Sequence, residues 1–411
     1  MARWLDDRSK SEALRILKWL FHDVFERNAE GGVNLHSWGE PETSSSLLVS
    51  RLSLHCDITP RTAQTLVRRA LIDSFKADPT SPSRFVEALS GLESSFLRKP
   101  LEGFVLLTSL SARDLHDFPT IRLDGATFTF SRFPPPRFGT PDLVVRHRWN
   151  DKRFFSRTAV RVHVRARDPM DAADLALQRL ELLRSFWNLG LHRGIWSIRM
   201  GDDVPPINKI RLGPIHTVHY PDGSSARDSF WYEPDFREGE FTETLGEEKK
   251  GKLREMETWC RTRLRRVPDR RKVEGLWIRY CQALDQRNRA NAFLQTWAIL
   301  EDLTGNPSRY DQLIRRASYL YSDRWYVRLQ LEEMRRRRNE LVHKGSNEEH
   351  PERMTFVLKG IVEHYLLFML RNPKIVGSPQ ALAAFLAQPT DVGARAQQMR
   401  RLQLAADVMK R

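Results

Sequence analysis

Residues 158–190 read TAVRVHVRARDPMDAADLALQRLELLRSFWNLG, and the change of periodicity within this stretch decides the fold class of the first part of the chain. Its opening residues alternate between valine and polar or charged side chains, which predicts a half-buried strand. The remainder repeats apolar side chains at helical spacing and finishes at Gly190, a natural helix terminator. A strand followed directly by a long helix predicts an α+β fold here.

The flanking sequence extends this pattern in both directions. Residues 120–130 place Asp124-Gly125 between two β-prone runs, which predicts a hairpin, and strand-like runs follow at 194–200 and 215–224. Nearer the start, residues 11–28 predict an amphipathic helix. Residues 46–75 predict a helix, a short turn and a second helix that Thr59 caps and Pro60 opens.

A polar, charged stretch at 237–252 predicts a linker, because the sequence beyond it is almost entirely helical in pattern. The expected helices lie at 251–266, 271–286, 288–304, 308–321, 324–344 and 352–371. We therefore expect an α+β domain at 1–245 with a sensing or regulatory role, an all-α helical bundle at 250–375 and a helical extension at 376–411.

Charge and cysteine content narrow the class of protein. The chain has 411 residues with 67 Lys or Arg against 52 Asp or Glu, a surplus that favours polyanionic partners and nucleic acid first. The longest apolar run is far too short to span a bilayer, and the acidic start is unlike a signal peptide. The cysteines show no metal or disulfide spacing, so we expect no metal site, no cofactor and a cytoplasmic location; they are Cys56, Cys260 and Cys281.

The segment MRRRRNELVHKG, residues 334–345, lies where the positive charge is most concentrated. On charge alone, an arginine run before a terminating glycine is a solvated helix end whose cations complement the helix dipole. Periodicity singles out one arginine, since stepping by four from Met334 on the apolar stripe leads to Arg338. A guanidinium among core positions needs a partner, which a second subunit or an anion in a cleft would supply.

His343 lies five residues after Arg338, so on a straight helix the two are rotated by about 140° from each other. The imidazole instead stacks over Asn339, four residues back, whose amide is suited to orient it. A frayed helix end or a second subunit would be needed to bring His343 towards Arg338.

The run RRRNELVH resembles the Arg-x4-6-His motif of HEPN domains, an all-helical superfamily of ribonucleases common in toxins and defence proteins. In that family a polar residue often follows the arginine, as Asn339 does here. The helix AFLQTWAILEDL, residues 292–303, resembles the aromatic-rich helix of the Apea-like HEPN subgroup, and Glu301 matches its embedded acid. The resemblance covers residues 250–372 and leaves 1–245 without a related family.

This resemblance implies metal-independent cleavage of RNA by attack of the ribose 2′-hydroxyl. Arg338, Asn339 and His343 would be the catalytic residues and Glu301 a supporting one, in a site formed between two copies of the domain. Arginine suits phosphate binding and histidine suits proton transfer near neutral pH. The flanking phosphates would contact the remaining basic residues of the run, Arg335, Arg336, Arg337 and Lys344. The family also implies an antiviral defence or toxin role, with a phage or regulatory trigger acting on residues 1–245.

Three alternatives remain open on the sequence alone. A HEPN-type fold can dimerise and bind RNA or nucleotide without cutting it, although an intact Arg-Asn-x3-His motif argues for cleavage. Residues 46–75 can belong to a DNA-binding regulator. His216 and His219 flank an expected loop at a spacing of three, but without a third ligand a zinc site is improbable.

Overall fold

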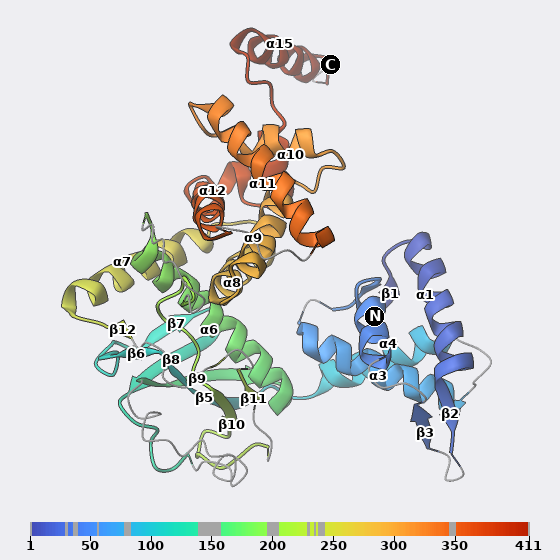
Figure 1. Cartoon of the computed structure of the whole chain (residues 1–411). Helices are drawn as coiled ribbons and strands as arrows, with labels where there is room; N and C mark the ends of the chain where they lie inside the picture. Colours follow the sequence, from blue (N-terminus) through green and yellow to red (C-terminus); the bar gives the residue numbers. More distant parts are fainter. Residues whose placement is uncertain are drawn as a thin grey trace.

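The protein is described by a computed structural model, which places residues 2–28, 32–35, 40–55, 57–77, 84–138, 158–194, 205–227, 231–233, 236, 243–344 and 351–409. A helical N-terminal unit precedes a six-stranded antiparallel sheet, and a group of helices follows (Figure 1). The predicted fold class, a mixed α and β part followed by an all-helical part, is confirmed. None of the described helices is long and apolar enough to cross a membrane.

The N-terminal unit has a hydrophobic core of its own, formed by residues 2–97. The helix predicted at 11–28 begins at Asp7 and ends at Val24, because residues 25–27 form a strand, and it buries Leu17, Phe21 and Val24. Asp6 accepts a hydrogen bond from the Ser9 amide at 2.6 Å and caps the first turn. The elements of this unit are β1 (Arg3–Trp4), α1 (Asp7–Trp19), a π-helical turn (Leu20–Val24), β2 (Phe25–Arg27), β3 (Val33–Leu35), α2 (Glu40–Val49), β4 (Leu52–Ser53), α3 (Pro60–Ala77) and α4 (Phe85–Arg98).

The connection between α2 and α3 differs from the predicted short turn. It runs from residue 50 to 59 and contains β4, which pairs with β1. A DNA-binding helix-turn-helix has a turn of about three or four residues, so this connection does not have that geometry. The predicted start of α3 is confirmed: Pro60 is its first residue, and the Thr59 hydroxyl accepts from the Thr62 amide at 3.4 Å.

The sheet has the strand order β11-β10-β5-β9-β8-β7. The predicted hairpin at 120–130 is confirmed, because Asp124 and Gly125 join β7 to β8 with φ of 47° and 80°, values that favour Asp and Gly in a two-residue turn. The strands are β5 (Glu102–Leu110), β7 (Ile121–Leu123), β8 (Ala126–Ser131), β9 (Thr158–Ala166), β10 (Ile215–His219) and β11 (Trp231–Tyr232), with β6 (Ala112–Arg113) and β12 (Glu243–Thr244) forming a separate parallel pair. The strand expected at 194–200 lies outside the described residues from 195 onward.

The strand and helix predicted at 158–190 are β9 and α6 (Pro169–His192). The three valines of β9 are buried towards α6, as their alternation predicts. Gly190 does not end α6, which continues to His192. A Cβ at this position would meet the Lys252 carbonyl oxygen at 3.2 Å, so the glycine permits the close approach of the following helix.

The predicted helices after residue 250 are present with end points shifted by a few residues, the largest change being at 308–321, where the helix covers only Tyr310–Ala317. An eighteen-residue terminal helix has no buried residue and stands away from the rest (Figure 1). The helices are α7 (Glu247–Leu264), α8 (Arg270–Asp285), α9 (Arg289–Leu303), α10 (Tyr310–Ala317), α11 (Arg324–Lys344), α12 (Pro351–Arg371), α13 (Pro373–Val376), α14 (Pro379–Leu386) and α15 (Val392–Met409).

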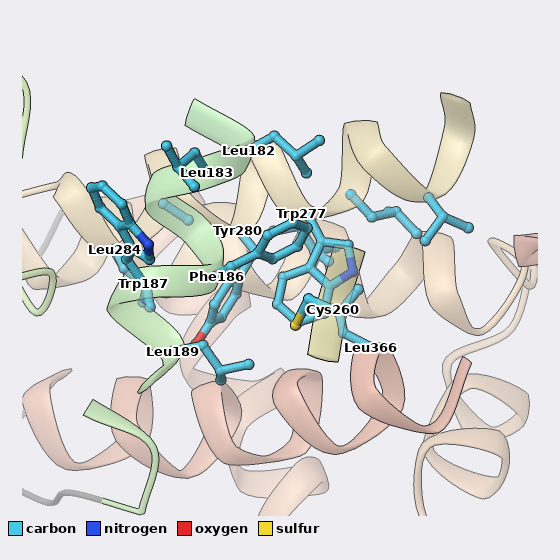
Figure 2. Close-up of a cluster of buried hydrophobic side chains, with 14 of the residues drawn as sticks. Leu182, Leu183, Phe186, Trp187, Leu189, Cys260, Trp277, Tyr280, Leu284 and Leu366 are labelled. Carbon is cyan, nitrogen blue, oxygen red and sulfur yellow. The ribbon is translucent and has the colours of Figure 1, made fainter. Parts of the chain in front are cut away.

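One continuous hydrophobic core joins the sheet, α6 and the C-terminal helices. Figure 2 shows its centre, where Phe186 and Trp187 of α6 lie beside Trp277 and Tyr280 of α8, with Leu366 of α12 nearby. The hydrophobic cores therefore separate between residues 97 and 104, whereas the composition of the chain changes near 245. The domain limits at 245–250 and 375 mark changes in sequence pattern and stay predictions.

Candidate functional site

α11 carries the arginine run on the continuation of a buried stripe. Val327, Leu331 and Met334 are 7%, 0% and 2% exposed, as their spacing predicts. Arg338 is the next position along that stripe and is half-buried, while Leu341 packs partly against the core. The apolar stripe is thus followed by a half-buried arginine.

The two arginines before Arg338 are paired with carboxylates of the same helix. Arg336 contacts Glu333 at 2.7 Å and also Glu340, and Arg337 contacts Glu333 at 2.6 Å. Hydrogen bonds from Arg336 and Arg337 hold the pKa of Glu333 at about 2, so this carboxylate stays charged over the physiological range. These spacings of three and four residues are the ordinary surface pairs of a helix.

Arg335 and Arg338 have a different environment. The guanidinium of Arg335 lies 5.4 Å from the centre of the Tyr310 ring, a cation–π contact. The Nη1 of Arg338 donates to the neighbouring Asn339 Oδ1 at 3.4 Å, a long and weak hydrogen bond. Among the residues that the structure describes, no carboxylate pairs with Arg338.

The remaining predicted site residues are only partly brought together. His343 and Lys344 belong to α11 by their backbone, but their side chains lie outside the described part of the structure, as do residues 345–350. Glu301 is on α9, where its carboxylate accepts from the Trp297 indole at 2.9 Å. Within the described residues no hydrogen bond or ion pair joins Glu301 to Arg338, and a supporting role for this acid stays a prediction.

A second polar centre, which no sequence motif predicted, lies between α6 and α8. The fully buried Arg184 donates to Glu181 at 2.7 Å and to both oxygens of Asp285 at 2.8 and 2.9 Å, and its other bonds go to the Ile210 carbonyl at 3.0 and 3.1 Å. Although burial opposes ionisation, the charges of Asp285 and Glu181 raise the pKa of Arg184. Glu181 is three residues from Arg184 on the same helix, but Asp285 and Ile210 are far away in sequence, so no local spacing indicated the whole cluster.

Asn208 connects this centre to a second buried group of ionisable residues. Its amide donates to Asp285 at 2.9 Å, and its Oδ1 lies 3.2 Å from the Nε2 of His192. His192 in turn lies 3.4 Å from Glu363, which also pairs with Lys359 at 2.9 Å and accepts from the Tyr280 hydroxyl. Burial is the largest single effect on Glu363 and favours its neutral form, but His192, Lys359 and Tyr280 together hold its pKa at about 2.

One cluster of potential metal ligands occurs among the described residues, and the sequence analysis did not identify it. Side-chain ligand atoms of Glu181, Cys281 and Asp285 lie within 4.8 Å of one another. Arg184 already bridges the two carboxylates, and its buried positive charge would repel a cation. Burial also raises the pKa of the Cys281 thiol, which disfavours the thiolate that metals bind. The cluster is therefore a poor metal site.

The two histidines weighed as zinc ligands do not flank a loop as expected, because both lie within β10. His216 has Thr108 Oγ1 at 2.7 Å and Glu233 at 3.1 Å, and His219 has the Thr217 hydroxyl at 2.8 Å. Both imidazole rings are therefore hydrogen-bonded within the protein.

The chain matches none of the protein-family models, curated proteins or solved structures with which it was compared.

Proposed function

We propose that the protein is a metal-independent endoribonuclease of the HEPN type whose site lies at the C-terminal end of α11. Following the resemblance, it acts in the cytoplasm as an antiviral defence or toxin effector, and residues 1–245 respond to the trigger. The observation that carries the proposal is the state of Arg338. This half-buried guanidinium has no carboxylate partner among the described residues, whereas the adjacent Arg336 and Arg337 are neutralised by glutamates.

The chemistry requires a proton carrier and a group that stabilises negative charge. The ribose 2′-oxygen forms a bond to phosphorus while the bond from phosphorus to the 5′-oxygen breaks, which leaves a 2′,3′-cyclic phosphate and a 5′-hydroxyl. His343 takes the proton from the 2′-hydroxyl and then delivers it to the leaving 5′-oxygen. Arg338 binds the phosphate oxygens and stabilises the charge that develops on them. Asn339 orients the imidazole.

Flanking phosphates would be bound by the rest of the run. Arg335 would bind a phosphate directly, while Arg336 and Arg337 must exchange a glutamate for a phosphate and so contribute less. Binding should weaken as salt increases, because each neutralised phosphate releases counterions.

A second copy of the chain is the partner that this site requires. The N-terminal half of α11 exposes a group of large apolar side chains, Trp325, Tyr326 and Leu329, which are 68%, 49% and 55% exposed. Residue 343 follows residue 325 by eighteen positions, which is about five turns, so a pairing along this face also brings the two copies of position 343 to the interface. Leu329→Glu should convert a dimer to a monomer in sedimentation experiments without unfolding it. A wild-type monomer at micromolar concentration, with or without RNA, would contradict the dimer.

The decisive experiment incubates purified protein with total RNA in EDTA and maps the new ends. We expect 5′-hydroxyl ends that survive EDTA, and a loss of about 10²-fold or more in rate for Arg338→Ala and for His343→Ala. Arg336→Ala, the matched substitution two residues away, should lower RNA binding slightly and leave the cleavage rate within a few fold. Each variant must retain the melting temperature of the wild type.

Cleavage by His343→Ala at the wild-type rate, in two independent preparations, would remove the catalytic assignment. RNA binding without new ends, for a wild type tested with and without infected-cell extract, would identify a binding module instead. Equal effects of all four arginines would indicate a solvated basic helix end.

A further inference from the structure

A cavity of about 310 Å³ lies where the N-terminal unit meets the sheet and the C-terminal helices. Its walls come from α3, from α6, from residues 211–236 and from the end of α8. The two hydrophobic cores on either side are separate, and Arg61 of α3 pairs with Asp174 of α6 at 3.5 Å in the cavity wall. A molecule in this cavity would touch all three parts of the protein.

The acidic groups that line the cavity are fixed from behind. Glu181 and Asp285 are held by the buried Arg184, and Glu233 lies 3.1 Å from the His216 ring. Their positions are therefore set before any ligand arrives, which lowers the cost of ordering on binding. The lining residues are Arg61, Asp174, Leu177, Gln178, Glu181, Arg211, Leu212, Tyr232, Glu233, Phe236, Gln282, Asp285 and Gln286.

Burial opposes the charged forms of Glu181 and Arg211, two residues of the lining. Burial, reinforced by the charges of Asp285 and Glu233, raises the pKa of Glu181 to about 7 even though Arg184 opposes this. Burial also lowers the pKa of Arg211 to about 10, because the attraction of Asp285 is offset by the repulsion of Arg184. A positive group near the acids and a negative group near Arg211 would each stabilise the charged form of its neighbour.

The size and the other walls restrict the ligand further. A volume of about 310 Å³ is at the small end of the range of about 300–1,000 Å³ that is usual for small-molecule sites. Leu177 and Leu212 supply apolar surface, Tyr232 and Phe236 supply aromatic surface, and glutamines supply amide donors and acceptors. A bare divalent cation has no group that would contact Arg211.

We propose that this cavity binds a small zwitterion of the amino-acid type. Its ammonium group lies against Glu181, Glu233 and Asp285, its carboxylate lies against Arg211, and its side chain contacts the apolar and aromatic walls. A diamine lacks the group for Arg211, and a simple carboxylate lacks the group for the acids, so neither should bind as well. The proposal does not depend on the ribonuclease assignment, because it concerns other residues and a different ligand.

The test is calorimetry and thermal shift on the full chain, with the twenty common α-amino acids supplied in pools and then singly. We expect at least one to bind, and its N-acetyl derivative and its amide to bind at least about 10-fold more weakly, since each loses one charge-assisted hydrogen bond. Putrescine, acetate and Mg²⁺ complete the panel and should not bind at the same concentration.

Two variants connect the binding to the cavity. Glu233→Gln keeps the acceptor for His216 but removes the charge, and the side chain is 35% exposed, so the fold should be retained while affinity falls at least about 10-fold. Arg69→Gln on α3, which pairs only at 3.8 Å with Asp73 on the exposed face, is the control and should bind as the wild type does. Absence of binding by every amino acid, binding of putrescine alone, or equal affinity of the folded Glu233→Gln variant would overturn the proposal.

Discussion

Arginines pair with carboxylates both at the end of α11 and in the polar centre between α6 and α8, but the two sets of pairs form in different ways. On α11, Arg336 and Glu333 are three residues apart, on the surface and surrounded by water. Between α6 and α8, Arg184 and Asp285 are about a hundred residues apart in the chain and are brought together by folding. A surface pair contributes little because water and salt compete with it, whereas a buried charge depends entirely on its partner. The difference indicates that loss of a buried partner destabilises the fold more than loss of a surface partner does.

The largest loss of stability is expected when the buried guanidinium of Arg184 is removed. Arg184→Ala leaves Glu181 and Asp285 without their common partner and should lower the free energy of unfolding by about 3–5 kcal/mol. Urea denaturation measures this. A triple variant that also carries Glu181→Gln and Asp285→Asn should recover part of the loss, because it removes the uncompensated charges. A loss under about 1 kcal/mol in Arg184→Ala would remove the contrast with the surface pairs.

Ionised Glu363 is expected to make a smaller contribution to the free energy of unfolding, and this contribution should depend on pH. Its pKa in the folded protein is about 2, below the value of 4.5 for an exposed glutamate, so ionised Glu363 stabilises the fold above pH 4.5 and this contribution is lost as pH falls towards 2. The contribution is up to about 3 kcal/mol, since one pKa unit corresponds to about 1.4 kcal/mol. Denaturation curves at pH 7, 5, 4 and 3 should fall less steeply for Glu363→Gln than for the wild type. Parallel pH profiles would contradict this assignment.

Two helical glycines allow a crowded position to be compared with an open one. A Cβ at Gly275 in α8 meets nothing within 4 Å, so Gly275→Ala should stabilise by about 0.5–1 kcal/mol through helix propensity. Gly190→Ala should lose this gain and be the less stable variant by about 1–2 kcal/mol, because α7 packs against that position. Thermal melts of the two variants measure the difference. If Gly190→Ala were as stable as Gly275→Ala, α6 and α7 would not need a glycine at their crossing.

The smallest effect on stability is expected at Arg336. Arg336→Ala breaks exposed pairs with Glu333 and Glu340 and should change the free energy of unfolding by less than about 1 kcal/mol. The dependence of RNA binding on salt should weaken by at most about one unit of slope, since one phosphate contact is lost. Fluorescence anisotropy at four salt concentrations measures the slope. A much larger change would mean that Arg336 releases its glutamates completely on binding.

The sequence by itself determined the elements whose information is local. The alternation in β9, the turn at Asp124-Gly125 and the helix of residues 324–344 all follow from neighbouring residues, and the structure contains each of them. The position of Arg338 after Met334 on the buried stripe is also local, which is why this part of the candidate site was predictable.

Tertiary structure alone decided which distant residues meet. The strand between α2 and α3 and the passage of α7 across Gly190 depend on packing between segments that no local period records. The same holds for the network of Arg184, Asn208 and Glu363 and for the cavity beside it. A buried charge is retained only where the fold supplies its partner, and the chain reveals that partner only after it has folded.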